Sequence, residues 1–155
     1  MTVEEATLHF SEEKAVVEKL KILIQMGLGY LRLGQPATTL SSGEAQRLKL
    51  ACEMTRSGAE NLLYLFDEPT TGLHYRDISF LLSAFDELLR KGHSICVIEH
   101  NMEVIKCADH VIDLGPEGGD QGGRLVYSGP INETFLKHPA SYTSRYLKRF
   151  IPSNK

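Results

Sequence analysis

The chain has 155 residues, about the length of one domain, with 17 Lys and Arg, 20 Asp and Glu, and a formal charge of −3. A hydrophobic fraction of 42% and a charged fraction of 24% are ordinary for a globular protein and argue against a disordered chain. No apolar run approaches the ~20 residues needed to span a bilayer, no signal peptide is visible, and the overall charge does not indicate a nucleic-acid surface.

The three cysteines, Cys52, Cys96 and Cys107, are odd in number and widely spaced. This pattern predicts neither a disulfide framework nor a CxxC metal site. We interpret them as buried small hydrophobic side chains, and we expect a cytoplasmic location, where thiols stay reduced.

The N-terminal residues predict two helices. Thr2 and Glu5 have the spacing of a capping box, and Ser11 could cap a second helix. Apolar residues recur at helical spacing up to Met26, and Gly27 suits the position just after the helix. The apolar positions are Val16, Val17, Leu20, Leu23 and Met26. A loop rich in Gly, Pro and Thr follows, from Gly29 to Thr39.

The next helix is predicted to start after Ser41, because Ser41 and Glu44 again fit a capping box. Its inward side chains are expected to be Ala45, Leu48, Ala51 and Met54 or Thr55.

A continuous apolar run over 62–66, closed by Asp67, predicts a strand buried on both faces by helices. A helix over about 77–90 and a second strand over 94–98 follow. The inward face of that helix is predicted to consist of Ile78, Leu81, Leu82, Phe85, Leu88 and Leu89. This alternation predicts a mainly parallel α/β sheet flanked by helices.

The C-terminal part predicts a short helix capped by Asn101, a strand over 111–114, a glycine-rich turn and a hairpin strand over 124–127. One or two amphipathic helices are expected over 131–151. The expected anchors are Phe135, Leu136, Tyr142, Tyr146, Leu147 and Phe150.

Asp67 and Glu68 are the first residues that suggest chemistry. Ligands of parallel α/β sheets bind beyond the carboxyl ends of the strands, where these two acids lie. One carboxylate there suits Mg²⁺, and the second could orient a water for attack on phosphorus. The alternative is a strand that ends in a solvated acidic turn.

The segment around Gly43 and the pair Glu99-His100 are weaker signals. A helix that starts at Ser41–Glu44 could bind a phosphate through its free N–H groups, although a plain capping box explains Ser41 and Glu44 equally well. If the strands ending at Asp67 and Ile98 are parallel neighbours, His100 should lie at the same sheet edge as Glu68. His100 could then contact a phosphate oxygen, although a single histidine after a strand is usually structural.

These three segments occur in an order that resembles the C-terminal half of an ATP-binding-cassette (ABC) nucleotide-binding domain. LSSGEAQR (40–47) resembles the signature motif, LFDEPTTGLH (65–74) resembles Walker B with the D-loop, and IEHN (98–101) resembles the switch-histidine segment. The stretches GLGYLRLGQPATTLSSGEAQRLKLA, DEPTTGLH and VIEHNMEVIKCADHVIDLGPEGGDQGG narrow the resemblance to the UvrA family of the excinuclease ABC system. The resemblance covers about residues 1–146.

The resemblance implies a damage-recognition ATPase of bacterial nucleotide excision repair that uses ATP and Mg²⁺, forms a homodimer, binds damaged duplex DNA and loads UvrB. Asp67 would coordinate Mg²⁺ through water, Glu68 would orient the hydrolytic water, and His100 would contact the γ-phosphate. Two further sets would act between nucleotide-binding halves. The nucleotide-binding signature residues would be Ser41, Ser42, Gly43 and Glu44, and the interface D-loop residues would be Thr71, Gly72 and Leu73.

The chain departs from the family at two points. Ser42 stands where the family usually has Gly, and no GxxxxGK[ST] P-loop or paired CxxC zinc motif occurs. We therefore expect a C-terminal fragment of a longer ATPase, inactive alone, with zinc only in the part upstream. The expected organisation is a helical lead-in and loop (1–40), the C-terminal half of an ABC ATPase domain (41–151) and a tail (152–155).

Two other functions stay open. One is a UvrA-like paralogue in drug resistance, and the other is a non-catalytic interaction module. The basic residues of the tail are interpreted as a solvated helix face and not as a DNA groove. They are Lys137, Arg145, Lys148, Arg149 and Lys155.

Overall fold

The computed structural model describes residues 1–55, 61–119 and 122–151. The chain divides into two compact units, Met1–Ile98 and Glu99–Lys155. The predicted tail over 152–155 lies outside the described residues.

The first unit opens with helix α1 (Val3–His9), and the predicted capping box is confirmed. The N–H of Glu5 donates to Thr2 Oγ1 at 3.1 Å, and the N–H of Thr2 donates to Glu5 Oε2 at 2.9 Å. Helix α2 (Lys14–Gln25) begins after Glu13, which makes no side-chain cap. The prediction that Ser11 caps this helix is therefore wrong, because the N–H groups of residues 11 and 13 continue the turns that follow α1.

Gly27 follows the end of helix α2, as predicted. This glycine has φ +69°, and its N–H bonds to the carbonyl of Ile24. The N–H of Leu28 reaches the carbonyl of Leu23 at 2.9 Å. The two bonds form a Schellman motif, which satisfies the last carbonyl groups of the helix.

Helix α3 (Ser42–Thr55) follows a short 3₁₀ turn, η1 (Ala37–Thr39). Its buried residues are Gly43, Arg47, Leu50, Ala51 and Met54. Ala51 and Met54 are buried as predicted. Nearer the start of the helix, Ala45 is exposed and Leu48 is only half-buried, so there the predicted inward face differs from the observed one. The cause is Arg47, a buried cation at a position that a hydrophobic pattern assigns to solvent.

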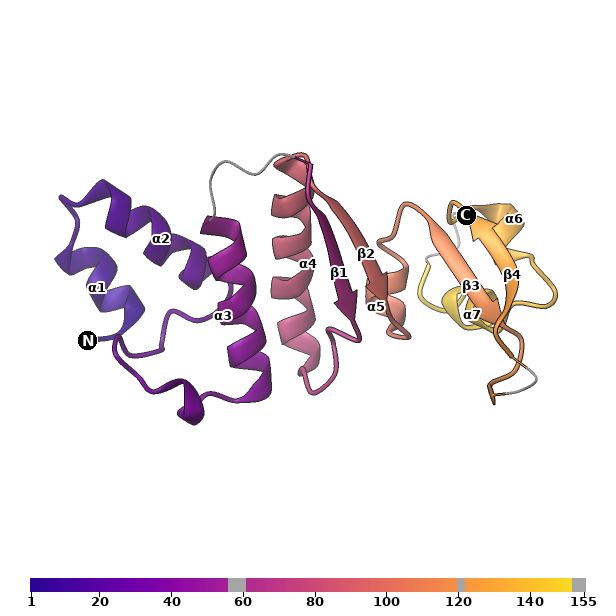
Figure 1. Ribbon diagram of the computed structural model, residues 1–155, viewed down its shortest axis with the longest axis horizontal. Coiled ribbons are helices and arrows are strands. Elements are labelled where there is room, and N and C mark those ends of the chain that lie inside the picture. The colour runs from indigo at the N-terminus through magenta and orange to yellow at the C-terminus, as the bar shows by residue number, and fades with distance from the viewer. Residues whose placement is uncertain (56–60, 120–121, 152–155) are drawn as a thin grey trace. The chain divides into compact units, whose positions relative to one another are not determined.

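Strands β1 (Leu63–Asp67) and β2 (Ser94–Ile98) pair in parallel, with Asp67 opposite Ile98. Helix α4 (Tyr75–Arg90) connects them and runs beside both strands (Figure 1). Its core side chains are Ile78, Leu81, Ala84, Phe85 and Leu88. The predicted stripe is confirmed except at Leu89, which is exposed, and Leu82, which is half-buried.

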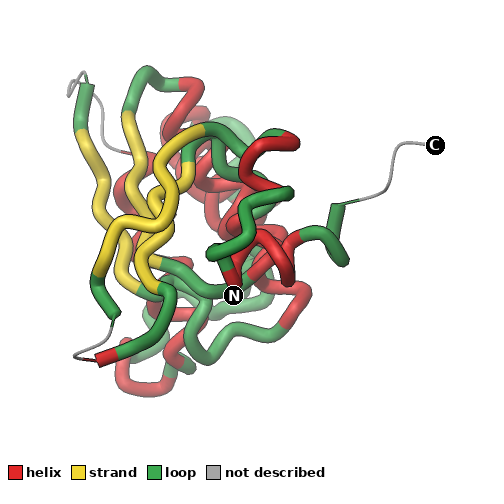
Figure 2. Tube along the Cα trace, turned by 90° about the vertical axis from the view of Figure 1, so that its right-hand side faces the viewer, coloured by secondary structure: helices red, strands yellow, loops and turns green. Residues whose placement is uncertain are grey.

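Only one face of this strand pair is covered. Leu63, Leu65 and Ile98 are 62%, 72% and 64% exposed, and within each unit the helices lie on one side of the strands (Figure 2). The prediction that β1 is buried on both faces is therefore wrong for this chain. Cys52, Cys96 and Cys107 are also exposed, which corrects the expectation that they are buried.

The second unit contains α5 (Met102–Ile105), capped by the predicted Asn101, whose Oδ1 accepts from the N–H of Glu103. Strands β3 (Val111–Gly115) and β4 (Arg124–Gly129) form the predicted antiparallel hairpin.

Two short helices complete the second unit, α6 (Glu133–Leu136) and α7 (Tyr142–Leu147). Phe135 and Leu147 are fully buried, as predicted. The other aromatic anchors, Tyr142, Tyr146 and Phe150, are exposed instead.

The chain is thus mixed α/β, with a parallel strand pair flanked by helices and a C-terminal hairpin with helices, as the sequence predicted. None of its described helices is both long enough and apolar enough to cross a membrane.

Candidate functional site

The signature segment (Ser41–Glu44) starts helix α3 through a complete capping box. The N–H of Glu44 donates to Ser41 Oγ at 3.2 Å, and the N–H of Ser41 donates to Glu44 Oε2 at 2.7 Å. Ser41 and Ser42 are exposed while Gly43 is buried. The two hydroxyl groups therefore lie at a helix N-terminus, where free N–H groups favour an anion.

Glu44 also holds the loop that precedes the helix. Tyr30 Oη donates to Glu44 Oε1 at 2.5 Å. This bond, followed by the bond from the Ser41 N–H, holds the pKa of the Glu44 carboxyl below its ordinary value. The same contact raises the pKa of Tyr30, since ionisation of the phenol would remove the donated proton.

The D-loop (Thr71–Leu73) packs directly against the signature segment. A Cβ added to Gly43 would lie 2.7 Å from Leu73 Cδ2, so a larger residue there would displace Leu73. A Cβ added to Gly72, whose φ is +75°, would lie 3.2 Å from Ser42 Oγ. The structure therefore brings two of the three predicted motifs into contact within the first unit.

The two acids lie at the carboxyl end of β1, as predicted. Asp67 is the last residue of the strand, and the N–H of Glu68 extends the pairing to the carbonyl of Ile98 at 2.9 Å. Glu68 has φ +42°, a left-handed conformation that costs a non-glycine residue roughly 1–2 kcal/mol.

Thr71 holds Glu68 in this conformation. Its N–H bonds to the Glu68 carbonyl at 3.0 Å, and its Oγ1 bonds to Glu68 Oε2 at 3.2 Å. Residue strain of this kind is common where a side chain must be aimed at a ligand.

A buried ion pair ties the signature helix to the segment after the D-loop. The guanidinium of Arg47 pairs with Asp77 in the first turn of α4. Asp77 Oδ2 also accepts from the N–H of His74 at 3.2 Å, and the N–H of Asp77 donates to the His74 carbonyl at 2.8 Å. Arg47 thus connects the signature helix to the turn that ends the predicted Walker B and D-loop stretch.

Sequence reasoning missed Arg47, Asp77 and Tyr30. A charged residue on the inward face of α3 could have indicated a buried pair, but the sequence offers no signal for its partner. Tyr30 lies 14 residues from Glu44 within a loop, and no sequence periodicity links the two.

His100 lies in the second unit, two residues beyond the end of β2. His100 is exposed, and its backbone N–H donates to Glu99 Oε2 at 2.9 Å. The carboxylate of Glu99 also accepts from the N–H of Asn101 at 3.0 Å. These bonds order the start of the second unit. The expected closeness of His100 to Glu68 stays a prediction.

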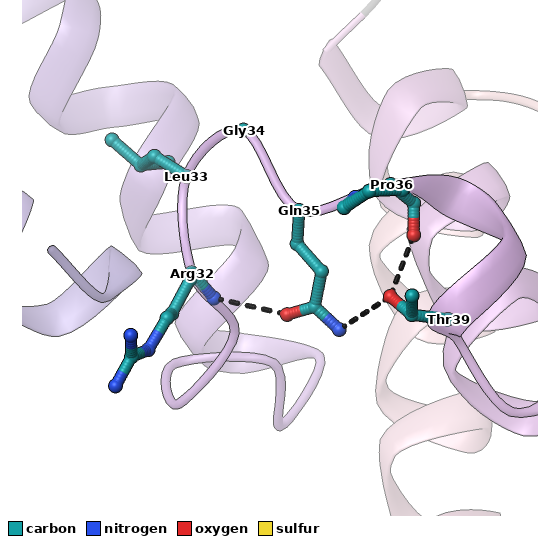
Figure 3. A pocket seen from close by; sticks show the side chains of 6 residues that line it. All are labelled: Arg32, Leu33, Gly34, Gln35, Pro36 and Thr39. Atoms are coloured by element: carbon teal, nitrogen blue, oxygen red, sulfur yellow. Dashed lines mark hydrogen bonds between the residues drawn. The ribbon is translucent and has the colours of Figure 1, made fainter.

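A shallow pocket of about 410 Å³ lies in the loop that leads to η1. Figure 3 shows the Gln35 side chain at its centre, bonded to the N–H of Arg32 at 3.4 Å and to Thr39 Oγ1 at 2.9 Å. The amide is therefore satisfied internally, and we interpret the pocket as a feature of a folded loop that supports the signature helix.

Known proteins resemble this chain in sequence and in fold. No protein-family model matches the chain. UvrABC system protein A of Synechocystis sp. is 52% identical over 153 residues, which cover 99% of this chain and 16% of that protein. The protein of the same name from Neisseria meningitidis serogroup B is 55% identical over 148 residues, which cover 96% of this chain and 16% of that protein.

The crystal structure of UvrA2 from Deinococcus radiodurans matches with a TM-score of 0.89 and 45% identity, over 98% of this chain and 18% of that one. The resemblance to the UvrA family is confirmed. The chain spans about 16% of the length of the curated relatives that it matches.

Proposed function

We propose that this chain is part of a UvrA-type DNA-repair ATPase. In this proposal, ATP binding and hydrolysis at sites shared between two nucleotide-binding halves of a homodimer drive binding to damaged duplex DNA and the loading of UvrB. The observation that carries the proposal is the contact between signature segment and D-loop on the unit that also presents Asp67 and Glu68.

The residues of this chain would act in two places. At the sheet edge of the first unit, Asp67 would hold Mg²⁺ through water and Glu68 would orient the attacking water. The role proposed for His100, in the second unit, is a contact to the γ-phosphate. Ser41 to Glu44 would present hydroxyl and N–H donors to ATP held by another half, with the D-loop along the boundary.

The donor set fits Mg²⁺ in this role. Asp67 and Glu68 are exposed hard-oxygen ligands beside each other, and the described residues contain no group of three or more candidate ligands that could hold a metal alone. Mg²⁺ is commonly bound by one or two carboxylates together with waters and substrate phosphates. When bound, it would neutralise charge on the transferring phosphoryl group.

Ser42 is compatible with signature function. The Ser42 side chain turns toward the D-loop, with its Oγ beside Gly72. A Cβ added to Gly72 would lie 3.2 Å from this oxygen. Gly43, which comes next, keeps the backbone free of a side chain.

The chain contains no GxxxxGK[ST] sequence, and that loop supplies much of the phosphate binding in P-loop ATPases. We therefore expect the chain alone to bind ATP weakly or not at all. Isothermal titration calorimetry on the 155-residue chain tests this, and micromolar affinity would contradict it.

The decisive experiment uses a complete UvrA-type protein that contains this sequence. Glu68→Gln should still bind ATP but lose most hydrolysis, and Asp67→Asn should impair Mg²⁺-dependent turnover. Glu12→Gln, the same chemical change at an exposed site in the loop between α1 and α2, is the control. Turnover in Glu68→Gln equal to that of the control would remove the role proposed for Glu68.

A UvrA-like paralogue that serves drug resistance is the second candidate, because the matched UvrA2 structure shows that the fold is shared beyond proteins named UvrABC system protein A. Restoration of ultraviolet survival in a strain that lacks its own UvrA would favour repair. Ser42 and the missing P-loop motif are the features that favour a non-catalytic interaction module. Loss of turnover in Glu68→Gln would count against that module.

A further inference from the structure

The C-terminal residues carry a charge opposite to that of the rest of the chain. Residues 134–155 contain five Lys or Arg and no Asp or Glu, while residues 1–133 contain 12 basic and 20 acidic side chains. Such asymmetry within one chain indicates a segment suited to a polyanionic partner.

Helix α7 and the turn after it arrange part of this charge. The guanidinium of Arg145 lies over the ring of Tyr142 at 5.2 Å, and that of Arg149 lies over the ring of Tyr146 at 5.5 Å. Tyr142 and Tyr146 are 43% and 52% exposed, and Lys148 lies between the two arginines in sequence. We call these five residues the α7 basic face.

The arginines are oriented without using their hydrogen-bond donors. Stacking on a ring fixes the plane of a guanidinium and leaves its N–H groups available. Among the described residues, neither arginine nor Lys148 forms an ion pair. In contrast, Lys137, the residue after α6, pairs with Glu133.

One acid does face this surface. Glu117, between β3 and β4, accepts a hydrogen bond from Tyr142 Oη at 3.0 Å. It touches the tyrosine and leaves both guanidinium groups without a carboxylate partner.

We propose that the α7 basic face binds the phosphate backbone of duplex DNA, which replaces the interpretation of these basic residues as a solvated helix face. The two guanidinium groups and Lys148 suit contacts to phosphate oxygens, and duplex DNA presents one phosphate charge per about 1.7 Å of its axis, against one per about 3.4 Å for one strand, so a duplex is favoured over a single strand. This proposal rests on the proposed function only in taking DNA as the class of partner. It requires neither ATP nor the signature segment.

The test measures binding of a fluorescein-labelled 20-base-pair duplex to the 155-residue chain by anisotropy between 0.05 and 0.2 M NaCl. Arg145→Gln and Arg149→Gln should each weaken binding about eightfold at 0.1 M salt and reduce the slope of log K against log salt by about 1. Glu117→Gln should strengthen binding. Arg90→Gln, which removes an arginine paired with Glu87 at 2.9 Å on α4, should leave it nearly unchanged.

A separate variant tests the stacking itself. Tyr146→Leu removes the ring under Arg149, so binding should weaken about two- to fivefold. Because the variant keeps every charge, the salt slope should not change. Circular dichroism checks that each variant keeps the fold.

The proposal would be overturned if the arginine variants bind the duplex as tightly as Arg90→Gln does. It would also be overturned if a single-stranded 20-mer binds as tightly as the duplex, or if the chain binds poly-glutamate but not DNA. Because no ATP is present, a negative result here would leave the ATPase proposal standing. Likewise, if the ATPase proposal proved wrong, a measured binding of the duplex to the α7 basic face would still stand.

Discussion

The ion pair between Arg47 and Asp77 predicts an unequal response to the loss of either partner. The Arg47 side chain is 6% exposed and that of Asp77 is 28% exposed. Asp77→Asn would leave a buried guanidinium without an anion, which costs about 3–5 kcal/mol in buried pairs. The partial exposure of Asp77 places the expected loss near the lower limit, at about 3 kcal/mol.

Arg47→Met should cost less. It leaves Asp77 in the first turn of a helix, where its carboxylate still accepts from the N–H of His74 at 3.2 Å and reaches solvent. Nη1 of Arg47 pairs with Asp77, and its Nε has no hydrogen-bond partner among the described residues, so methionine loses little besides the ion pair and the position over the Phe80 ring. We expect a loss of about 1–2 kcal/mol.

Urea denaturation of the two single variants and the double variant, followed by circular dichroism, measures both losses and their coupling. The double variant should resemble Arg47→Met, since no buried cation then remains. Glu87→Gln, which breaks the exposed pair with Arg90, should cost under about 0.5 kcal/mol. A loss in Asp77→Asn that is equal to or smaller than the loss in Arg47→Met would show that the buried guanidinium does not need its anion.

Two further predictions concern Glu68 and Glu44. Glu68→Gly should be more stable than Glu68→Ala by about 1 kcal/mol in urea denaturation, because only glycine adopts φ +42° without strain; equal stabilities would show that the backbone relaxes. The depressed pKa of Glu44 means that its contribution to stability is present above the ordinary carboxyl pKa and is lost as pH falls through the lowered value. Tyr30→Phe should therefore raise the pKa of Glu44 toward the ordinary value in a carboxyl-carbon NMR titration, and an unchanged pKa would exclude Tyr30 as its main cause.

Most features set by local sequence were predicted well, although Ser11 does not cap α2. The capping boxes at Thr2 and Ser41, the cap at Asn101 and the helix end at Gly27 each depend on residues within a few positions of one another. The parallel pairing of β1 and β2 followed from a helix between two apolar runs, because such a connection leaves few other topologies.

Features set by distant residues were not predicted. The hydrophobic pattern of α3 placed Ala45 inward, whereas the helix turns Arg47 inward to meet Asp77, 30 residues later. The packing of Gly43 on Leu73 depends on the D-loop conformation, which no periodicity specifies. The candidate site was identified by residue types and their order, and its internal contacts required the structure.

The strand β1 shows a different kind of discrepancy. Its apolar run predicted burial on both faces, yet Leu63 and Leu65 are 62% and 72% exposed. Ile98 on β2 is exposed as well, so apolar side chains of neighbouring strands share the bare face. We infer that such a run is suited to a sheet with a second covering layer.

That inference predicts self-association of the isolated chain, since an uncovered apolar sheet face promotes it. The double variant Leu63→Thr/Leu65→Thr should reduce association in sedimentation velocity without lowering the urea midpoint, because these side chains contribute little burial and threonine suits a strand. Leu8→Gln, at a residue that is 80% exposed on α1, is the matched control and should leave association unchanged. If the threonine variant associates as the parent does, the bare face is not what brings the chains together. If the threonine variant instead unfolds at a markedly lower urea concentration, Leu63 and Leu65 are buried within a single chain. The prediction that β1 is buried on both faces would then be correct.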